Sequence, residues 1–203
     1  AFAPGMRRDI EACVATRAGV LLADGRRLDV VDLYEHRGDV DLASGNLHSR
    51  GSLRIDGSVH EGMLATASGD VQVRGDVLDG EVMAGGSVVV QNGVLGPHAR
   101  VVALGSLHCR HATAARLSAG QDLFVADQAA HCRLSARRIE LRSGRGALLG
   151  GEARARESIV VRSAGSAGAA ATTLIAGDVV DSAADVVRAT WQDELLRQRA
   201  ARG

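Results

Sequence analysis

Histidine and cysteine side chains, which are common ligands of zinc, gather in one stretch of the sequence. The cluster consists of His108, Cys109, His111, His131 and Cys132. Thiolates and imidazoles can hold a zinc ion, so a metal site is one hypothesis for this stretch. The repeat described below argues against it, because it places Cys109 in an inward apolar column and Cys132 on another part of the repeat unit. The sequence therefore predicts buried thiols and no bound metal or cofactor.

Arginine forms the second chemical feature of the sequence. The position after each apolar triplet of the repeat holds Asp56, Arg74, Gln91, Arg110, Ala126, Arg142 and Arg162. We call Arg74, Arg110, Arg142 and Arg162 the arginine strip, since a regular repeat would place them along one edge of the molecule. Guanidinium groups recognise carboxylates and phosphates, so the strip is a candidate surface for an acidic partner. Charged residues also protect an exposed sheet edge from pairing with other chains, and we favour this second interpretation.

The remaining polar residues do not indicate catalysis. His48, His60 and His98 are expected in solvent, and no Ser-His-Asp order or paired-carboxylate spacing stands out. The glycine-rich segments at 144–146 and 150–151 lack the Lys-Ser/Thr pair and the following helix of a phosphate-binding loop. We therefore predict that the protein is not an enzyme.

Composition excludes several classes of partner. The 203 residues include 24 basic and 24 acidic side chains, so the formal net charge is zero, and every basic residue is Arg. A neutral chain with one Trp, one Tyr and two Phe has neither the field nor the stacking surface that nucleic acids favour. Three cysteines do not form a disulfide framework, which is typical of a reducing compartment, so we expect the cytoplasm. No apolar run approaches the roughly 18 residues that span a membrane.

A repeat determines where these side chains lie. Short triplets with an apolar first and third residue recur about every 16 to 20 residues, a period that indicates a repeat architecture. Their middle residue varies, which is the alternation of a β-strand with one buried face. The triplets are Leu53–Ile55, Val71–Val73, Val88–Val90, Leu107–Cys109, Leu123–Val125, Ile139–Leu141 and Ile159–Val161.

A second ladder of small and apolar residues precedes the triplets. Four residues before each triplet stand Ser49, Ala67, Ala84, Ala103, Ala119 and Ala155, and six before stand Leu47, Ala65, Val82, Val101, Leu117 and Ala153. The Ile139 unit needs a gap of one residue to bring Leu134 and Ala136 into line. Gly51, Gly69, Gly86 and Gly105 stand at the corner between the two strands, where their backbone freedom helps a tight turn.

These columns predict an all-β chain folded as a parallel β-solenoid of about seven coils. Each coil adds about 4.8 Å, so the rod is roughly 30–35 Å long. We assign residues 1–44 to a small β cap and entry segment that leads into the first coil, with a hairpin at Asp24-Gly25. Residues 45–178 are assigned to the solenoid and residues 179–203 to an α-helix. Val187, Trp191 and Leu195 follow helical spacing and are either packing residues or a helix interface, and the helix could begin a coiled coil.

Several motifs resemble those of the flagellar assembly protein A family. They are Gly38–Leu47, Gly69–Gly80, Ala84–Val90, Ala119–Leu123, Ala147–Glu152 and Gly165–Gly168. The resemblance covers about residues 15–178 and implies a bacterial cytoplasmic β-solenoid, right-handed and usually followed by a coiled-coil helix. It further implies a non-enzymatic scaffold or regulator in flagellar assembly, whose protein partners include flagellar assembly factors or the glucose-specific phosphocarrier of the sugar phosphotransferase system. The later corners depart from the family pattern, since Arg137, Arg138, Arg156 and Glu157 replace glycine there.

Two other functions use related folds. A polymer-forming cytoskeletal solenoid of the bactofilin kind would assemble into a homo-oligomer through exposed end strands. A trimeric hexapeptide-type acyltransferase would use a histidine such as His108 or His111 as a base. Gly45, Gly51 and Gly57 do recur at a spacing of about six residues, but the longer coils do not keep that rhythm.

Overall fold

The computed structural model describes residues 6–8, 13–15, 20–24, 27–165 and 171–177, with side chains from residue 32 onward. Two antiparallel pairs come first: β1 (Met6–Arg8) with β2 (Cys13–Ala15), and β3 (Val20–Asp24) with β4 (Arg27–Val31). The β3–β4 register closes at Asp24 and Arg27, which confirms the hairpin predicted around Asp24-Gly25. The predicted helix over 179–203 lies outside the described residues.

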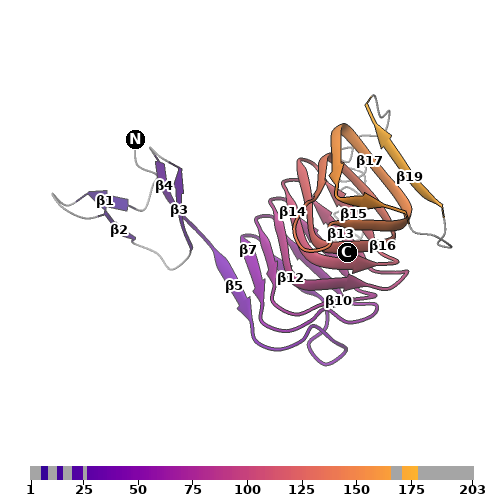
Figure 1. The fold of residues 1–203 in the computed structure, drawn as a ribbon. Coiled ribbons are helices and arrows are strands. Elements are labelled where there is room, and N and C mark those ends of the chain that lie inside the picture. The colour runs from indigo at the N-terminus through magenta and orange to yellow at the C-terminus, as the bar shows by residue number, and fades with distance from the viewer. Residues whose placement is uncertain (1–5, 9–12, 16–19, 25–26, 166–170, 178–203) are drawn as a thin grey trace, which may run out of the picture.

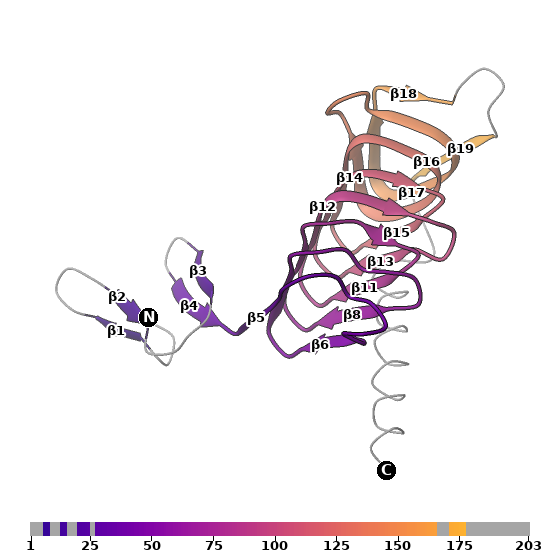
Figure 2. The same cartoon turned by 90° about the horizontal axis from the view of Figure 1, so that it is seen from below.

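The rest of the described chain is a parallel β-solenoid of about eight turns, which confirms the predicted fold class (Figures 1 and 2). Its first ladder contains the triplets found in the sequence, paired in register from one coil to the next. The strands that contribute to this ladder are β5 (Leu33–His36), β7 (Ser52–Ile55), β9 (Val71–Val73), β12 (Val88–Leu95), β14 (Leu107–Thr113), β16 (Asp122–Leu141) and β17 (Ala147–Val161).

The second ladder is also confirmed. Its strands are β6 (Leu47–Ser49), β8 (Leu64–Ala67), β11 (Glu81–Ala84), β13 (Arg100–Ala103) and β15 (Arg116–Ala119), followed by the middle parts of β16 and β17 and by β19 (Thr172–Ala176). Leu134 pairs with Ala153 and Ala136 with Ala155, so the gap of one residue is where the sequence required it.

A third ladder was not anticipated from the sequence. It stacks one buried residue per coil, and its strand segments include β10 (Val77–Leu78) and β18 (Ser163–Ala164). The column holds Val40, Val59, Val77, Val94, Ala112, Ala129 and Leu148, all with no exposed surface. The inward residues of three ladders therefore close the core, which consists almost entirely of Val, Leu, Ile and Ala.

The additional coil lies at the N-terminal end. Tyr34 pairs with Leu53 and His36 with Ile55, so β5 occupies the first-ladder position one coil before the first triplet. This coil has no apolar triplet, which is why the sequence pattern contained only seven. The ladder thus begins at Leu33, inside the segment assigned to a cap, while β1–β4 form sheets separate from the solenoid (Figure 1).

Corners between the ladders are held by side chains that accept hydrogen bonds from the next coil. Asp70 Oδ1 accepts from the Ser87 amide at 2.7 Å, and Ser87 Oγ accepts from the Ser106 amide at 3.1 Å. At the later corners, where glycine is missing, the Gln121 carbonyl accepts from the amides of Arg137 and Arg138 at 2.9 and 3.2 Å. The chain therefore turns there without the glycines of the earlier coils.

Candidate functional site

The two cysteines of the His/Cys cluster do not converge with its histidines. Cys109 is 5% exposed in the first ladder, and Cys132 is fully buried opposite Gly151. His108 and His131 are exposed. Burial raises the pKa of the Cys109 thiol to about 12 and also raises the pKa of Cys132. Both thiols are therefore protonated at neutral pH and belong to the core, as the repeat indicated.

Metal and base chemistry find no further support in the described part of the chain. It contains no group of three or more His, Cys, Asp or Glu side chains that could hold a metal ion. His108 and His111, considered above as catalytic bases, make no hydrogen bond to a carboxylate within these residues. His60 Nε2 lies 3.3 Å from Asp39 Oδ2, and His48 Nδ1 lies 2.6 Å from Thr66 Oγ1. These contacts link neighbouring coils.

The arginine strip follows aligned positions of the first ladder, and all four side chains are exposed. Arg74 pairs with Asp56 at 3.0 Å and Arg142 with Glu140 at 2.9 Å, while Arg162 donates to the Gly144 carbonyl at 3.3 Å. Arg110 differs, because its side chain has no hydrogen bond or ion pair among the described residues. Its charge acts on Asp127, whose pKa is lowered mainly by hydrogen bonds from Arg145.

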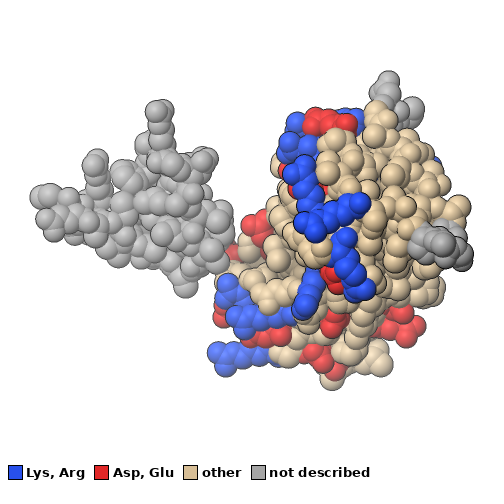
Figure 3. All heavy atoms as spheres, in the orientation of Figure 1, with Lys and Arg blue, Asp and Glu red and all other residues tan. Residues whose placement is uncertain are grey.

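The strip is not continuous. Gln91 and Ala126 occupy its positions on either side of Arg110. Figure 3 shows arginines and acidic side chains next to one another on the same face of the solenoid. Most charges on this face are therefore paired, and the exposed Arg110 has no ion pair among the described residues.

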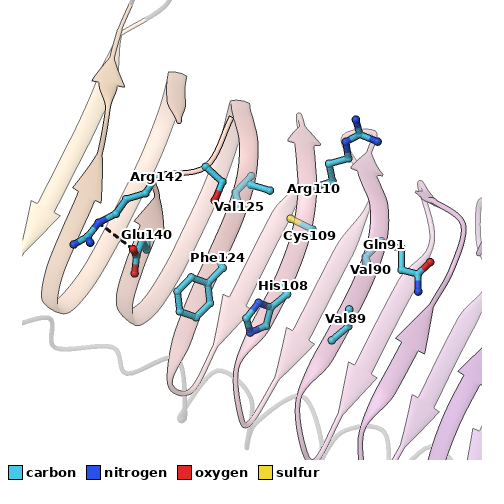
Figure 4. Close-up of a pocket in the computed structure, with 12 residues that line it drawn as sticks. Val89, Val90, Gln91, His108, Cys109, Arg110, Phe124, Val125, Glu140 and Arg142 are labelled. Carbon is cyan, nitrogen blue, oxygen red and sulfur yellow. Dashed lines mark ion pairs between the residues drawn. The ribbon is translucent and has the colours of Figure 1, made fainter. Parts of the chain in front are cut away.

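A groove of about 550 Å³ runs beside the strip across four coils (Figure 4). One wall consists of the outward middle residues of the triplets, Val89, His108, Phe124 and Glu140. The opposite wall is part of the strip column, Gln91, Arg110, Ala126 and Arg142. Val90, Cys109 and Val125 lie between the walls and form the floor.

The first wall changes character along the rod. In the early coils it is polar and cross-linked, since Arg54 pairs with Glu35 at 2.6 Å and donates to Gln72 Oε1 at 3.2 Å. In the groove its first three residues are apolar or aromatic, and its fourth, Glu140, is paired with Arg142. Val89 is 39% exposed, and the rings of His108 and Phe124 stack with centroids 4.6 Å apart and planes at 19°. The sequence showed these residues only as a variable middle position.

Another set of aligned arginines was missed by the sequence analysis. Arg100, Arg116 and Arg133 pair in register in the second ladder. Arg100 binds Glu81 at 3.2 Å, and Arg116 and Arg133 are exposed. The signal was present, because each of these residues stands directly before the inward apolar column, but only apolar positions were compared there.

Val187, Trp191 and Leu195, the predicted helix interface, lie outside the described residues. Within the described part of the chain, no helix is long and apolar enough to cross a membrane.

Comparison with known proteins identifies the family of this solenoid. The family described as Flagellar Assembly Protein A beta solenoid domain matches residues 32–195. The chain belongs to this family, which confirms the resemblance read from its motifs. The match begins next to β5, the first strand of the solenoid. Comparisons with curated proteins and with solved structures gave no match.

Proposed function

We propose that this chain is a non-enzymatic scaffold that presents a rigid β-solenoid to protein partners in flagellar assembly or its regulation. The observation that carries the proposal is membership of the flagellar assembly family across the entire solenoid. That family is not a known class of enzyme.

The form of the molecule supports such a role. The inward residues of its three ladders are buried, and successive coils are linked by continuous parallel ladders. Outward side chains therefore repeat at about 4.8 Å along a stiff support. A support of this kind can hold a binding surface in place without rearranging, which limits the entropy cost of association.

The partners we propose are flagellar assembly factors or the phosphocarrier of the sugar phosphotransferase system, met in the cytoplasm. The arginine strip of Arg74, Arg110, Arg142 and Arg162 is the proposed contact surface, because exposed guanidinium groups suit acidic partner surfaces. The segment with Val187, Trp191 and Leu195 is a second proposed contact.

Deletion of the gene in its native bacterium tests the proposal. We expect fewer or misplaced flagella by electron microscopy and reduced swimming, with recovery when the wild-type chain is restored. Purified phosphocarrier, titrated into the full chain by calorimetry, tests that partner directly. Normal flagella and swimming in the deletion strain would contradict the proposed role.

A cytoskeletal polymer is the second candidate function. The observation that favours it is the last described strand, β19, where Leu174 is 44% and Ile175 37% exposed. Apolar residues on a terminal strand invite pairing with another chain. The assembly state of the purified protein separates this candidate from a scaffold, because only a polymer forms filaments.

A further inference from the structure

The groove of Figure 4 places Val89, His108 and Phe124 on one wall opposite Arg110 and Arg142 on the other. The early coils do not have this combination of apolar and basic walls. We propose that the groove binds an extended segment of a partner protein in which an acidic residue stands beside an apolar or aromatic one. This inference rests on the proposed function and deepens it by naming the surface and the chemistry of the segment that it recognises.

The apolar wall supplies the first half of the recognition. Val89 and the stacked rings of His108 and Phe124 are not covered by polar cross-links of the Glu35-Arg54-Gln72 kind. Exposed apolar and aromatic side chains that line a groove mark interaction sites more often than scattered ones do. An apolar side chain of the partner would remove this wall from water, which favours association.

The basic wall supplies the second half. Ala126 occupies the strip position between Arg110 and Arg142, so only a methyl group stands between the two arginines in that column. Since coils repeat at about 4.8 Å and the two arginines are two coils apart, their Cα atoms are about 10 Å apart. Figure 4 shows the Arg142 guanidinium turned toward Glu140 and the Arg110 guanidinium turned away from it, so both side chains would rotate to meet a carboxylate that enters over Ala126. Arg110 can bind it without breaking an existing ion pair, because it has none among the described residues, whereas Arg142 would first release Glu140.

The dimensions of the groove suit an extended chain. It crosses four coils, which at about 4.8 Å each corresponds to about 14 Å between the outer rows. An extended segment rises about 3.3 Å per residue, so about four or five residues fill the groove. Successive side chains of such a segment point to opposite sides, which would direct an acidic residue to the arginines and its neighbour to the aromatic wall.

Peptide selection tests the proposal directly on the groove and needs no partner protein. Random peptides of about ten residues, longer than the groove, are displayed on phage and selected on the full chain, with excess Arg110→Glu variant in solution as competitor. We expect enrichment of peptides with Asp or Glu next to Phe, Trp or Leu. Fluorescence anisotropy with the enriched peptides should show at least about tenfold weaker binding to Arg110→Glu and to Val89→Asp.

Arg116→Glu is the matched control. Arg116 is exposed, lies in the second ladder rather than the groove, and its replacement changes the net charge by the same amount. Binding unaffected by this control supports the groove. An absence of acidic-apolar enrichment, or equal loss of binding in Arg116→Glu, overturns the proposal. So does a concentration-dependent dimer that Arg110→Glu abolishes, because the groove would then bind a second copy of this chain.

A cellular arm separates the two proposals. The Arg110→Glu/Val89→Asp variant is introduced into the deletion strain, with Arg116→Glu as control. If the deletion impairs flagella and the groove variant restores them fully, the groove proposal is wrong and the scaffold function stands. If the deletion has no effect, the scaffold function is wrong whatever the groove binds.

Discussion

Single residues at the corners limit how closely the coils can stack. A methyl group at Gly105 would lie 2.6 Å from Ser87 Oγ and 3.1 Å from the carbonyl of Gly86. Ser87 Oγ cannot move freely, since it accepts the amide hydrogen of Ser106. The glycine column of the early coils thus reflects a lack of space between corners.

Gly105→Ala should therefore destabilise the protein by about 1–3 kcal/mol, because either the hydrogen bond at Ser87 or the coil spacing must yield. Denaturant unfolding followed by circular dichroism gives the change in the free energy of unfolding. Gln121→Ala is the matched control, since Gln121 occupies the same corner one coil later, is exposed and already carries a side chain. Equal stability of Gly105→Ala and wild type would show that the corner has room.

At the scale of the elements, ion pairs connect successive coils at the later corners, which lack the glycines of the earlier ones. Arg138 donates to both carboxylate oxygens of Asp122, at 2.6 and 2.8 Å, and joins the two ends of β16 across one coil. The Arg137–Glu157 pair at 2.5 Å adds a link to β17. Hydrogen bonding from Arg138 holds the pKa of Asp122 below its ordinary value.

A lowered pKa means that folding favours the ionised form of Asp122. Its contribution to stability is therefore complete above the pKa of the unfolded chain and is lost as the pH falls through the lower pKa of the folded state. We expect the melting temperature of wild type to decrease more steeply below about pH 4 than that of Asp122→Asn. Arg138→Leu should flatten the same profile. Parallel profiles for wild type and both variants would contradict this account of the pair.

At the scale of the whole molecule, the first and last described strands of the solenoid differ in polarity. The first coil presents Tyr34, Glu35 and His36, and Glu35 is paired with Arg54. The last described strand presents Leu174 and Ile175 instead. Charged side chains on an edge strand disfavour its pairing with another chain, so Glu35 and Arg54 oppose head-to-tail stacking of copies at β5.

We therefore expect size-exclusion chromatography with light scattering to give a monomer or small oligomer across a concentration series. Negative-stain electron microscopy of any material in the void volume provides the complementary observation. Filaments there would contradict the scaffold and favour the cytoskeletal polymer, whereas a stable trimer would reopen the acyltransferase hypothesis.

Sequence alone determined the coil and most of its inward columns. A β-strand buries alternate residues, and each coil must place the same column above the last, so both constraints leave a periodic record in the chain. The sequence also predicted the position of Leu134 and Ala136 correctly, although their coil contains a gap of one residue. The column of Val59 and Val77 could not be predicted from the sequence, because a ladder with one buried residue per coil shows no alternation. The coil of Tyr34 could not be predicted either, because a strand at the end of the solenoid does not need apolar side chains.

Only the tertiary structure decided what the outward residues do. The sequence placed Arg74, Arg110 and Arg142 in one column. In the structure Arg74 pairs with Asp56 of the preceding coil and Arg142 with Glu140 of its own coil. Arg110 differs from both because it has no ion pair among the described residues. The groove is likewise built from four coils, whose contributions are far apart in the chain. Outward positions are under no common packing constraint, so a periodic column shows where such residues align but not which of them pair, because pairing depends on side-chain contacts across coils.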